Sequence, residues 1–588
     1  METSSSDRLF CCPWVRRIVP VAYRDELYHI LRMTVPVLIT RILAYLPSFV
    51  NTMFAGRLGN NVMAGYGLAC ATINISTSST GFGLAVACDT LVSQTFGGKN
   101  LLRVGVILQR GILILLLFCL PCWALLINAQ AVLLCLGQDP EVARIAQMYI
   151  IAFIPAVPAM YLQQLQVSYL QNQVIILPQM FTAVCANIAN AMTNYILVYW
   201  LELGVSGSVA ANALCHFYSC GFLFMYIWWK KLHAETWGGW SMEALQEWGS
   251  FMKLAIASTV MKCAEWWVYE FGGFFAGMVG EDELAAQHGV IMIGFITYMF
   301  PMGIQAAACA RVGNALGAGN TSRAKLTIKV SFGLAVSFAI VQGTVLGSIK
   351  HVIGHLFTND ENIVSLVSHL MNAYCFLQFF DGLVCVSTGI FVGSGKQKIP
   401  AVANLIAYYG IGLTMGLVLM FVVKLNTLGF WLGLLICVSV QSTFFITVII
   451  FKLDWKTITD EAVKRAHKIT NLALLNEKML LENMSNDNSV QAPGTGNTET
   501  IDGYKAPYLR NDEAVQQIQC GRPKKGRALS TSQLLLRRGL VALGALVVLA
   551  VGISVHFLVP LPESQASQIN STLEWINTTE ASTLLFSV

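Results

Sequence analysis

Apolar runs of about 20 residues recur along most of the chain, and each is long enough to cross the hydrocarbon core of a membrane as a helix. The runs predict helices because a spanning segment must satisfy its own backbone hydrogen bonds in lipid. We expect them at 29–54, 62–94, 105–128, 145–169, 176–200 and 207–229, and then at 251–279, 284–311, 326–348, 364–391, 399–424 and 429–452. A further run at 534–560 predicts a thirteenth span. The pattern is that of an all-α, polytopic protein of the lipid bilayer.

Composition supports a membrane protein. Of 588 residues, 55% are hydrophobic and only 12% are charged, and the mean hydropathy is +0.60. Such a chain is too apolar for one or two soluble domains. The formal net charge of +5 comes mostly from short basic loops, so it does not indicate nucleic-acid binding.

The basic loops also predict an orientation, since Lys and Arg in short loops favour the cytoplasmic side. They occur in residues 1–28, in alternate loops that include 230–250, and in the polar stretch 453–533, which is typical of a disordered cytoplasmic linker. We therefore expect a cytoplasmic N-terminus and an extracellular tail at 561–588 after the thirteenth span. That tail carries two N-glycosylation sequons, Asn570-Ser-Thr and Asn577-Thr-Thr.

The two halves of the chain repeat one another. The motif Phe54-Ala55-Gly56-x-x-Gly59 recurs 221 residues later as Phe275-Ala276-Gly277-x-x-Gly280. Four more positions are matched 220 residues later: Gly83, Ala87, Gly97 and Asn100 by Gly303, Ala307, Gly317 and Asn320. This near-constant offset predicts two six-helix lobes, 29–229 and 251–452, that form a parallel repeat about an axis along the membrane normal. Secondary transporters use this plan and bind substrate between or within the lobes.

The segment from Lys262 to Glu270 places two carboxylates and three aromatic rings in an otherwise apolar span. Ionisable groups at that depth are costly and usually mark an ion or substrate path. On a helix, Glu265 shares a face with Tyr269, and Trp266 shares another with Glu270, so the two acids point in different directions. A desolvated carboxylate binds a proton readily, and Trp and Tyr rings attract organic cations. The segment therefore predicts a site where a proton and a cation compete.

Asp381 is the other acid that lies within an apolar stretch of the second lobe. We interpret Glu265 and Asp381 as the groups that exchange a proton for a cation, with assistance from Glu270. The residues that we expect along the substrate path are Trp266, Tyr269, Tyr298 and Gln378. The alternative for each acid is a structural ion pair, because Lys262 precedes Glu265 by three residues and Arg41 holds the equivalent place in the first lobe.

Catalytic motifs are not apparent, and we expect a transporter rather than an enzyme. The stretch Gly393-Ser-Gly395-Lys396-Gln397 lacks the glycine spacing and the Ser or Thr after Lys of a phosphate-binding loop. Most cysteines lie in apolar runs, where Cys behaves as a small hydrophobe. The sequence thus predicts no cofactor and no metal site, and energy from an ion gradient.

Six sequence motifs in the chain are long enough to be specific for one protein family. They are Gly83-Leu-Ala-Val-Ala-Cys-Asp89-Thr-Leu-Val-Ser-Gln94-Thr, Gly105-Val-Ile-Leu-Gln-Arg110, Pro121-Cys-Trp-Ala, Thr236-Trp-Gly-Gly-Trp240-Ser, Glu265-Trp-Trp-x-Tyr-Glu270 and Arg311-Val-Gly-Asn-Ala-Leu-Gly-Ala-Gly319. They resemble the vertebrate branch of the multidrug and toxin extrusion (MATE) family, over about residues 25–455 and the last helix. The resemblance implies a two-lobe fold of twelve helices and a thirteenth, exchange of cytoplasmic organic cations for external protons, and a place in the plasma membrane.

Three positions depart from the family pattern. Vertebrate relatives carry a further acid in helix 8, where this chain has Met292, and a Glu in helix 10, where it has Asp381. Many prokaryotic relatives carry an Asp in helix 1 at the place of Asn51. The resemblance then implies that coupling lies in the second lobe and relies on fewer acids.

Residues and resemblance together predict a monomeric, proton-coupled antiporter that exports small organic cations, including drugs and toxins. Two alternatives stay open. Because one acid is missing, the protein could be coupled to sodium or could carry uncharged or anionic substrates. A channel or receptor is the alternative from another class, and a saturable exchange flux without unitary currents would exclude it.

Overall fold

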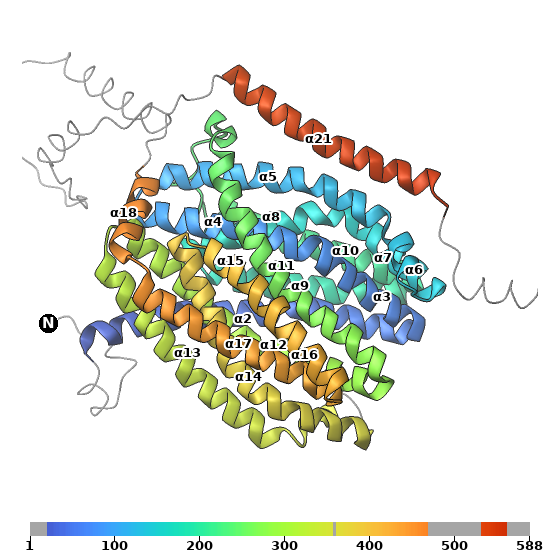
Figure 1. Ribbon diagram of the computed structural model, residues 1–588. Coiled ribbons are helices and arrows are strands. Elements are labelled where there is room, and N and C mark those ends of the chain that lie inside the picture. The colour runs from blue at the N-terminus through green and yellow to red at the C-terminus, as the bar shows by residue number, and fades with distance from the viewer. Residues whose placement is uncertain (1–19, 357–359, 468–530, 561–588) are drawn as a thin grey trace, which may run out of the picture.

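In the computed structural model, the described residues are 20–356, 360–467 and 531–560, and they form helices and no strands (Figure 1). The first half contains α2 (Val21–Leu58), α3 (Asn60–Ile73), η2 (Asn74–Ser78), α4 (Ser79–Gly97), α5 (Leu101–Ile127), α6 (Ala129–Cys135), α7 (Pro140–Phe153), η3 (Ile154–Ala156), α8 (Val157–Asn172), α9 (Leu177–Tyr195), η4 (Ile196–Trp200) and α10 (Gly204–Trp229). The short η5 (Met242–Leu245) follows in the connection between the halves.

The second half repeats this order of long helices. It contains α11 (Trp248–Val279), α12 (Glu281–Gly317), α13 (Thr321–Ile349), η6 (Ile353–Leu356), α14 (Glu361–Ser394), α15 (Lys398–Asn404), η7 (Leu405–Leu413), α16 (Thr414–Leu417), η8 (Val418–Val422), α17 (Asn426–Thr447), η9 (Val448–Lys452) and α18 (Trp455–Ala466). After a gap in the described residues comes α21 (Thr531–Leu558).

Every segment predicted to span the membrane is helical. Eleven helices in the described part of the chain are long and apolar enough to cross a membrane, which makes this a multi-pass membrane protein. The predicted spans 62–94 and 251–279 are helical as well, but polar and charged side chains lower their hydropathy below that of the eleven. The total of thirteen spans therefore stays a prediction, and the two more polar helices are those that carry Asp89 and Glu265.

Buried side chains form separate cores in the two lobes. One core extends from Ala55 to Ala255 and includes side chains of α4, α5, α7 and α8. Another extends from Val268 to Val438 and joins α11, α12, α14 and α17. These two cores lie mainly in different lobes, and two smaller ones, which pair Ile30 with Ala307 and Val86 with Cys309, lie between the lobes, where α4 also contacts α11 and α12.

Close backbone contacts join the lobes where α4 meets α12. A Cβ atom on Gly97 would clash with the backbone carbonyl of Asn314, and one on Gly317 would clash with the carbonyl of Gln94. Gly97 and Gly317 are repeat partners, as are Gln94 and Asn314, so each lobe makes the same contact with the other. The glycines matched in the sequence are thus needed for close approach at the axis that relates the lobes.

Polar contacts close the same end of the bundle, where the start of α2 and helix α18 lie (Figure 1). The Glu26 carboxylate of α2 accepts hydrogen bonds from Arg311 Nε and Nη2, both at 2.6 Å, and from Thr327 Oγ1 at 2.7 Å. Helix α18 touches both lobes, because Arg465 Nη1 donates to Gln94 Oε1 at 2.9 Å and Lys396 Nζ donates to Glu461 Oε2 at 2.8 Å. These contacts join the lobes on the side that the loop charges assign to the cytoplasm.

Helix α21 lies along α5 at the edge of the bundle (Figure 1). Asn128 Nδ2 donates to the carbonyl of Gly552 at 2.9 Å. Near the other end of α21, Arg538 Nε donates to the carbonyl of Leu245 at 2.9 Å, and its guanidinium lies 4.5 Å from the ring centre of Trp248. The last helix therefore packs on the first lobe and on the start of α11, outside both cores.

The α4–α12 contact leads to a prediction about stability. We expect Gly317→Ala to lower the melting temperature of the purified protein, because the added methyl group forces the helices apart and overpacking costs ~1–3 kcal/mol. Gly347 of α13 is the matched control, since a Cβ atom there would meet nothing within 4 Å. Gly347→Ala should melt at or above the wild-type temperature, and equal melting of both variants would contradict a tight contact at Gly317.

Candidate functional site

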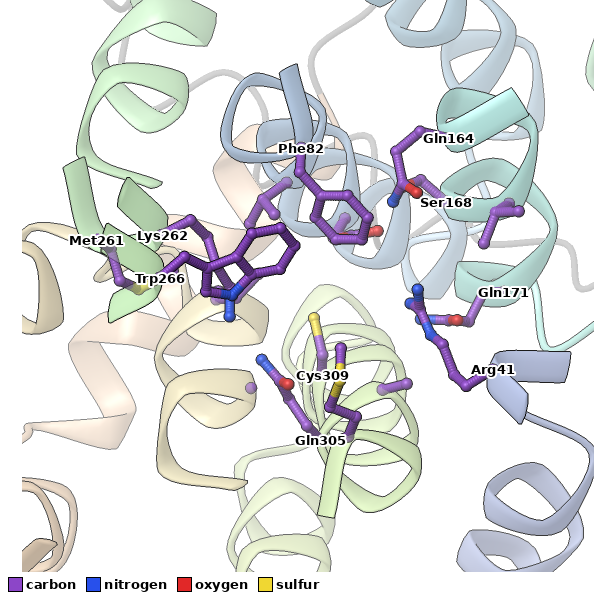
Figure 2. A pocket seen from close by; sticks show the side chains of 17 residues that line it. Arg41, Phe82, Gln164, Ser168, Gln171, Met261, Lys262, Trp266, Gln305 and Cys309 are labelled. Carbon is purple, nitrogen blue, oxygen red and sulfur yellow. The ribbon is translucent and has the colours of Figure 1, made fainter. Parts of the chain in front are cut away.

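A cavity lies between the two lobes (Figure 2). Helices α2, α4 and α8 of the first lobe contribute part of its lining, and α11, α12 and α14 of the second lobe contribute the rest. The charged and aromatic side chains of the lining are Arg41, Phe82, Asp89, Lys262 and Trp266. The cavity thus lies at the lobe interface and is lined by both charged and apolar side chains.

Repeat partners line this cavity from opposite sides. Arg41 and Lys262 are 221 positions apart, and Asp89 and Cys309 are 220 apart. The pseudo-symmetry therefore places a cation on each side but supplies an acid among the lining residues from the first lobe alone. Asp89 Oδ1 accepts a hydrogen bond from Asn172 Nδ2 at 2.7 Å and lies within electrostatic range of Arg41.

Glu265 is held by two donors inside the second lobe. Its Oε2 accepts a hydrogen bond from Lys262 Nζ at 2.9 Å, and its Oε1 accepts one from Tyr298 OH at 2.7 Å. Glu265 is 6% exposed and Lys262 is 4% exposed, so the ion pair is buried. Helix α11 brings the two side chains together, because residues three apart lie side by side on a helix. The ion-pair alternative considered from the sequence is therefore present in the structure.

Asp381 lies close to this pair but is held differently. It is 8% exposed on α14 and is within electrostatic range of both Glu265 and Lys262. Among the described residues, no side chain or backbone group donates a hydrogen bond to its carboxylate. Buried ionised groups normally have such partners. Asp381 is thus the acid of this site whose oxygens are left for a proton or a cation.

Tyrosines surround the two acids. Tyr269 of α11 and Tyr298 of α12 lie within electrostatic range of both carboxylates, as does Tyr408 of η7. Tyr408 is fully buried, and its hydroxyl has no hydrogen-bond partner in the part of the chain that the structure describes. The predicted residues Tyr269 and Tyr298 are therefore near the acids, and Tyr408 completes the group.

Other predicted residues lie apart from the two acids. Trp266 faces the central cavity, where its ring centre is 5.9 Å from that of Phe82. Glu270 is exposed on the surface of α11, on a different side of the helix from Glu265. Gln378 is directed at α13, since its Nε2 donates to the carbonyl of Ala339 at 2.9 Å. The sequons at Asn570 and Asn577 lie outside the described residues.

Tyr408 is not among the site residues predicted from the sequence, and the position of Asp89 in the cavity lining is not predicted either. Tyr408 occurs in an apolar span, so the argument from the cost of buried polar groups, which selected the acids, could have found it. From the sequence alone, Asp89 lies toward the inner end of its predicted span and is expected to cap a helix or to form an ion pair. The packing of α4 against α8 instead brings it to the central cavity beside Asn172.

The first lobe has a neutral cluster where an acid could have stood. Asn51 Nδ2 donates to Asn212 Oδ1 at 2.8 Å, and Asn51 Oδ1 accepts from Asn194 Nδ2 at 2.8 Å. Met292, another departure from the family pattern, accepts a hydrogen bond at its sulfur from Tyr45 OH at 3.3 Å. Asn51 and Met292 thus both make uncharged contacts where relatives carry an acid.

The family model described as MatE matches residues 36–196 and again residues 257–418, one match in each half. The chain belongs to the MATE family of membrane transporters. Multidrug and toxin extrusion protein 1 of Danio rerio is 46% identical to it over 562 residues, which cover 94% of each chain. The protein of that name from Homo sapiens is 43% identical over 547 residues, which cover 92% of this chain and 94% of the relative.

Solved structures agree with the MATE fold. The crystal structure of the eukaryotic MATE transporter AtDTX14 superposes with a TM-score of 0.73 at 27% identity, over 76% of this chain and all of that chain. The Vibrio cholerae MATE transporter VcmN in the bent form gives a TM-score of 0.65 at 13% identity, over 76% of this chain and all of that one. The all-α, two-lobe fold predicted from the sequence is confirmed.

The placement of Gln378 in this MATE transporter leads to a second prediction. Gln378→Leu should lower the melting temperature, because the loss of a buried hydrogen bond costs ~1–3 kcal/mol, yet it should leave ligand binding at the acids unchanged. Thr344→Val, at an exposed position of α13, is the control and should alter neither property. A Gln378→Leu protein with normal melting and weakened cation binding would place this amide in the substrate path instead.

Proposed function

We propose that this MATE transporter is a proton-coupled antiporter that exports organic cations. The observation that carries the proposal is the buried pair Glu265 and Asp381, surrounded by tyrosines, with the oxygens of Asp381 unpartnered among the described residues. The printed names of the relatives refer to multidrug and toxin extrusion, which supports drugs and toxins as substrates. Tyrosine rings attract organic cations, and carboxylates bind either protons or cations.

The charge balance of the site explains why proton and cation exclude each other. Glu265 and Asp381 carry two negative charges when both are ionised, and Lys262 neutralises one of them. The remaining charge lies in a low-dielectric site, where an uncompensated ion is costly, so it must be balanced by a proton or by a cationic substrate. Proton binding from outside then releases the cation, and cation binding from inside releases the proton.

The second lobe is the better place for this exchange. In the first lobe, Asn51 is part of a neutral amide cluster, and Asp89 already accepts a hydrogen bond from Asn172. Trp266 and Lys262 line the central cavity and lie on α11 beside Glu265, so a substrate in the cavity is next to the coupling pair. Glu270, on the exposed side of α11, would assist entry rather than hold the exchanged proton.

We also propose that the transporter is a monomer of the plasma membrane with its N-terminus in the cytoplasm. The start of α2 and helix α18, which belong to the basic segments 1–28 and 453–533, lie at the same end of the bundle (Figure 1), and this supports the orientation. The peptide after α21 then lies outside the cell. Glycosylation reports the orientation directly, because it occurs on the lumenal or extracellular side.

Glycosidase digestion tests the orientation. The full-length protein from animal cells should run faster in gels after digestion, and the double variant Asn570→Gln/Asn577→Gln should lose that shift. The control is Asn483→Gln, which removes the sequon of the predicted cytoplasmic linker and should leave the shift unchanged. A shift that depends on Asn483 alone would reverse the orientation.

Transport in proteoliposomes tests the coupling. With an imposed pH gradient, uptake of a fluorescent organic cation should fall by ~100-fold in Glu265→Gln and Asp381→Asn. Side chains positioned for proton transfer typically change the rate of the step they assist by about that factor or more. Glu270→Gln should reduce uptake far less, and Glu281→Gln, at an exposed acid on α12, is the control without effect. Uptake driven by a sodium gradient but not by a pH gradient would replace proton coupling by sodium coupling.

A further inference from the structure

Lys262 stands between the coupling carboxylate and the central cavity. Its side chain lines the cavity beside Trp266 (Figure 2), while Glu265 does not reach the lining. On α11 the direction of Lys262 lies ~60° from that of Glu265 on one side and ~40° from that of Trp266 on the other. A ligand that enters the cavity therefore meets the Lys262 side chain before it meets the carboxylate.

Both oxygens of that carboxylate are occupied. Lys262 Nζ is 2.9 Å from Oε2, and the hydroxyl of Tyr298 is 2.7 Å from Oε1. A cationic substrate can bind Glu265 only if one donor leaves, and Lys262 is the donor whose side chain lines the cavity. Lysine suits such an exchange because its charge is carried on a flexible four-carbon stem and makes no bidentate contact.

Displacement of the Lys262 ammonium from Glu265 would not leave its charge without a partner. Lys262 is also within electrostatic range of Asp381, which has no hydrogen bond among the described residues. An ammonium that leaves Glu265 can thus move toward the second acid. A buried ion pair gains little net free energy because desolvation offsets most of the attraction, so replacing one cation by another in the pair is inexpensive.

We propose that Lys262 is a tethered cation that occupies Glu265 in competition with the substrate and thereby selects singly charged organic cations over doubly charged ones. This inference rests on the proposed export of organic cations. Two acids and one tethered cation leave room for a single positive charge. Arg41, the repeat partner of Lys262 on the other side of the cavity, adds repulsion against a second charge.

A purely structural ion pair would behave differently. It would stabilise the packing of α11, and its loss would lower the melting temperature, but it would not alter the preference between one and two charges on a ligand. Charge preference therefore separates the two roles. Two substitutions test this: Lys262→Gln changes the charge preference, and Lys262→Arg changes the affinity for both probes in the opposite direction.

The experiment measures equilibrium binding to the full-length protein in lipid nanodiscs without any gradient. The probes are tetraethylammonium and a bis-quaternary ammonium ion with the same head groups. Lys262→Gln removes the tethered charge but keeps a hydrogen-bond donor, so we expect about tenfold tighter binding of tetraethylammonium and a larger gain for the dication. Lys262→Arg holds Glu265 with a planar fork, so we expect about tenfold weaker binding of both probes.

Lys253→Gln is the matched control, since Lys253 is exposed on the same helix. It should bind both probes as the wild type does. If Lys262→Gln does not fold, as its melting curve would show, Lys262→Arg decides the question, because that variant keeps the ion pair. If the wild type binds both probes and the folded Lys262 variants bind them with the same affinity, Lys262 does not compete with the substrate. Only the role proposed for Lys262 would then be overturned. Failure of every protein to bind either probe would overturn the proposed function itself.

Discussion

The ion pair between Lys262 and Glu265 is the interaction on which the rest of the site depends. A lone carboxylate inside a membrane protein would be neutralised or would destabilise the fold, because the surrounding medium cannot solvate it. With Lys262 and Tyr298 as donors, each carboxylate oxygen of Glu265 has a hydrogen-bond partner at 6% exposure. Asp381 then differs from Glu265 in its surroundings, although the two acids are chemically alike. One acid of the site is thus paired within the protein, and the other is the one that the proposed function pairs with a proton or a substrate.

Much of the fold follows from patterns that are visible in the sequence. Apolar runs predict the helices because lipid forces each span to satisfy its own backbone, and the 220-residue offset predicts the two lobes because duplicated segments pack in the same way. The free-energy cost of placing an ionisable side chain within the membrane selects Glu265 and Asp381 as candidate site residues. The count of thirteen spans and the linker boundaries stay predictions, since composition alone does not define where a polar helix such as α4 or α11 lies in the bilayer.

The arrangement around the acids could not be predicted in the same way. Helical spacing shows that Gln378 is one turn from Asp381, but the packing of α13 decides that its amide binds the carbonyl of Ala339. Tyr408 lies near the acids but belongs to η7, and the sequence of η7 does not show that it packs close to α11 and α14. Contacts between distant segments depend on how helices pack, and periodicity within one helix carries no information about its neighbours.

The contact of Gly97 with Asn314 and of Gly317 with Gln94 has a mechanical consequence. The two contacts are equivalent under the axis that relates the lobes, so they lie close to that axis, and a relative rotation of the lobes about this point displaces them very little. Displacement grows with distance from the pivot, so the same rotation moves the far ends of the helices most. The close contacts at Gly97 and Gly317 can thus be the point about which the lobes rotate, while the distant helix ends move enough to open and close the central cavity.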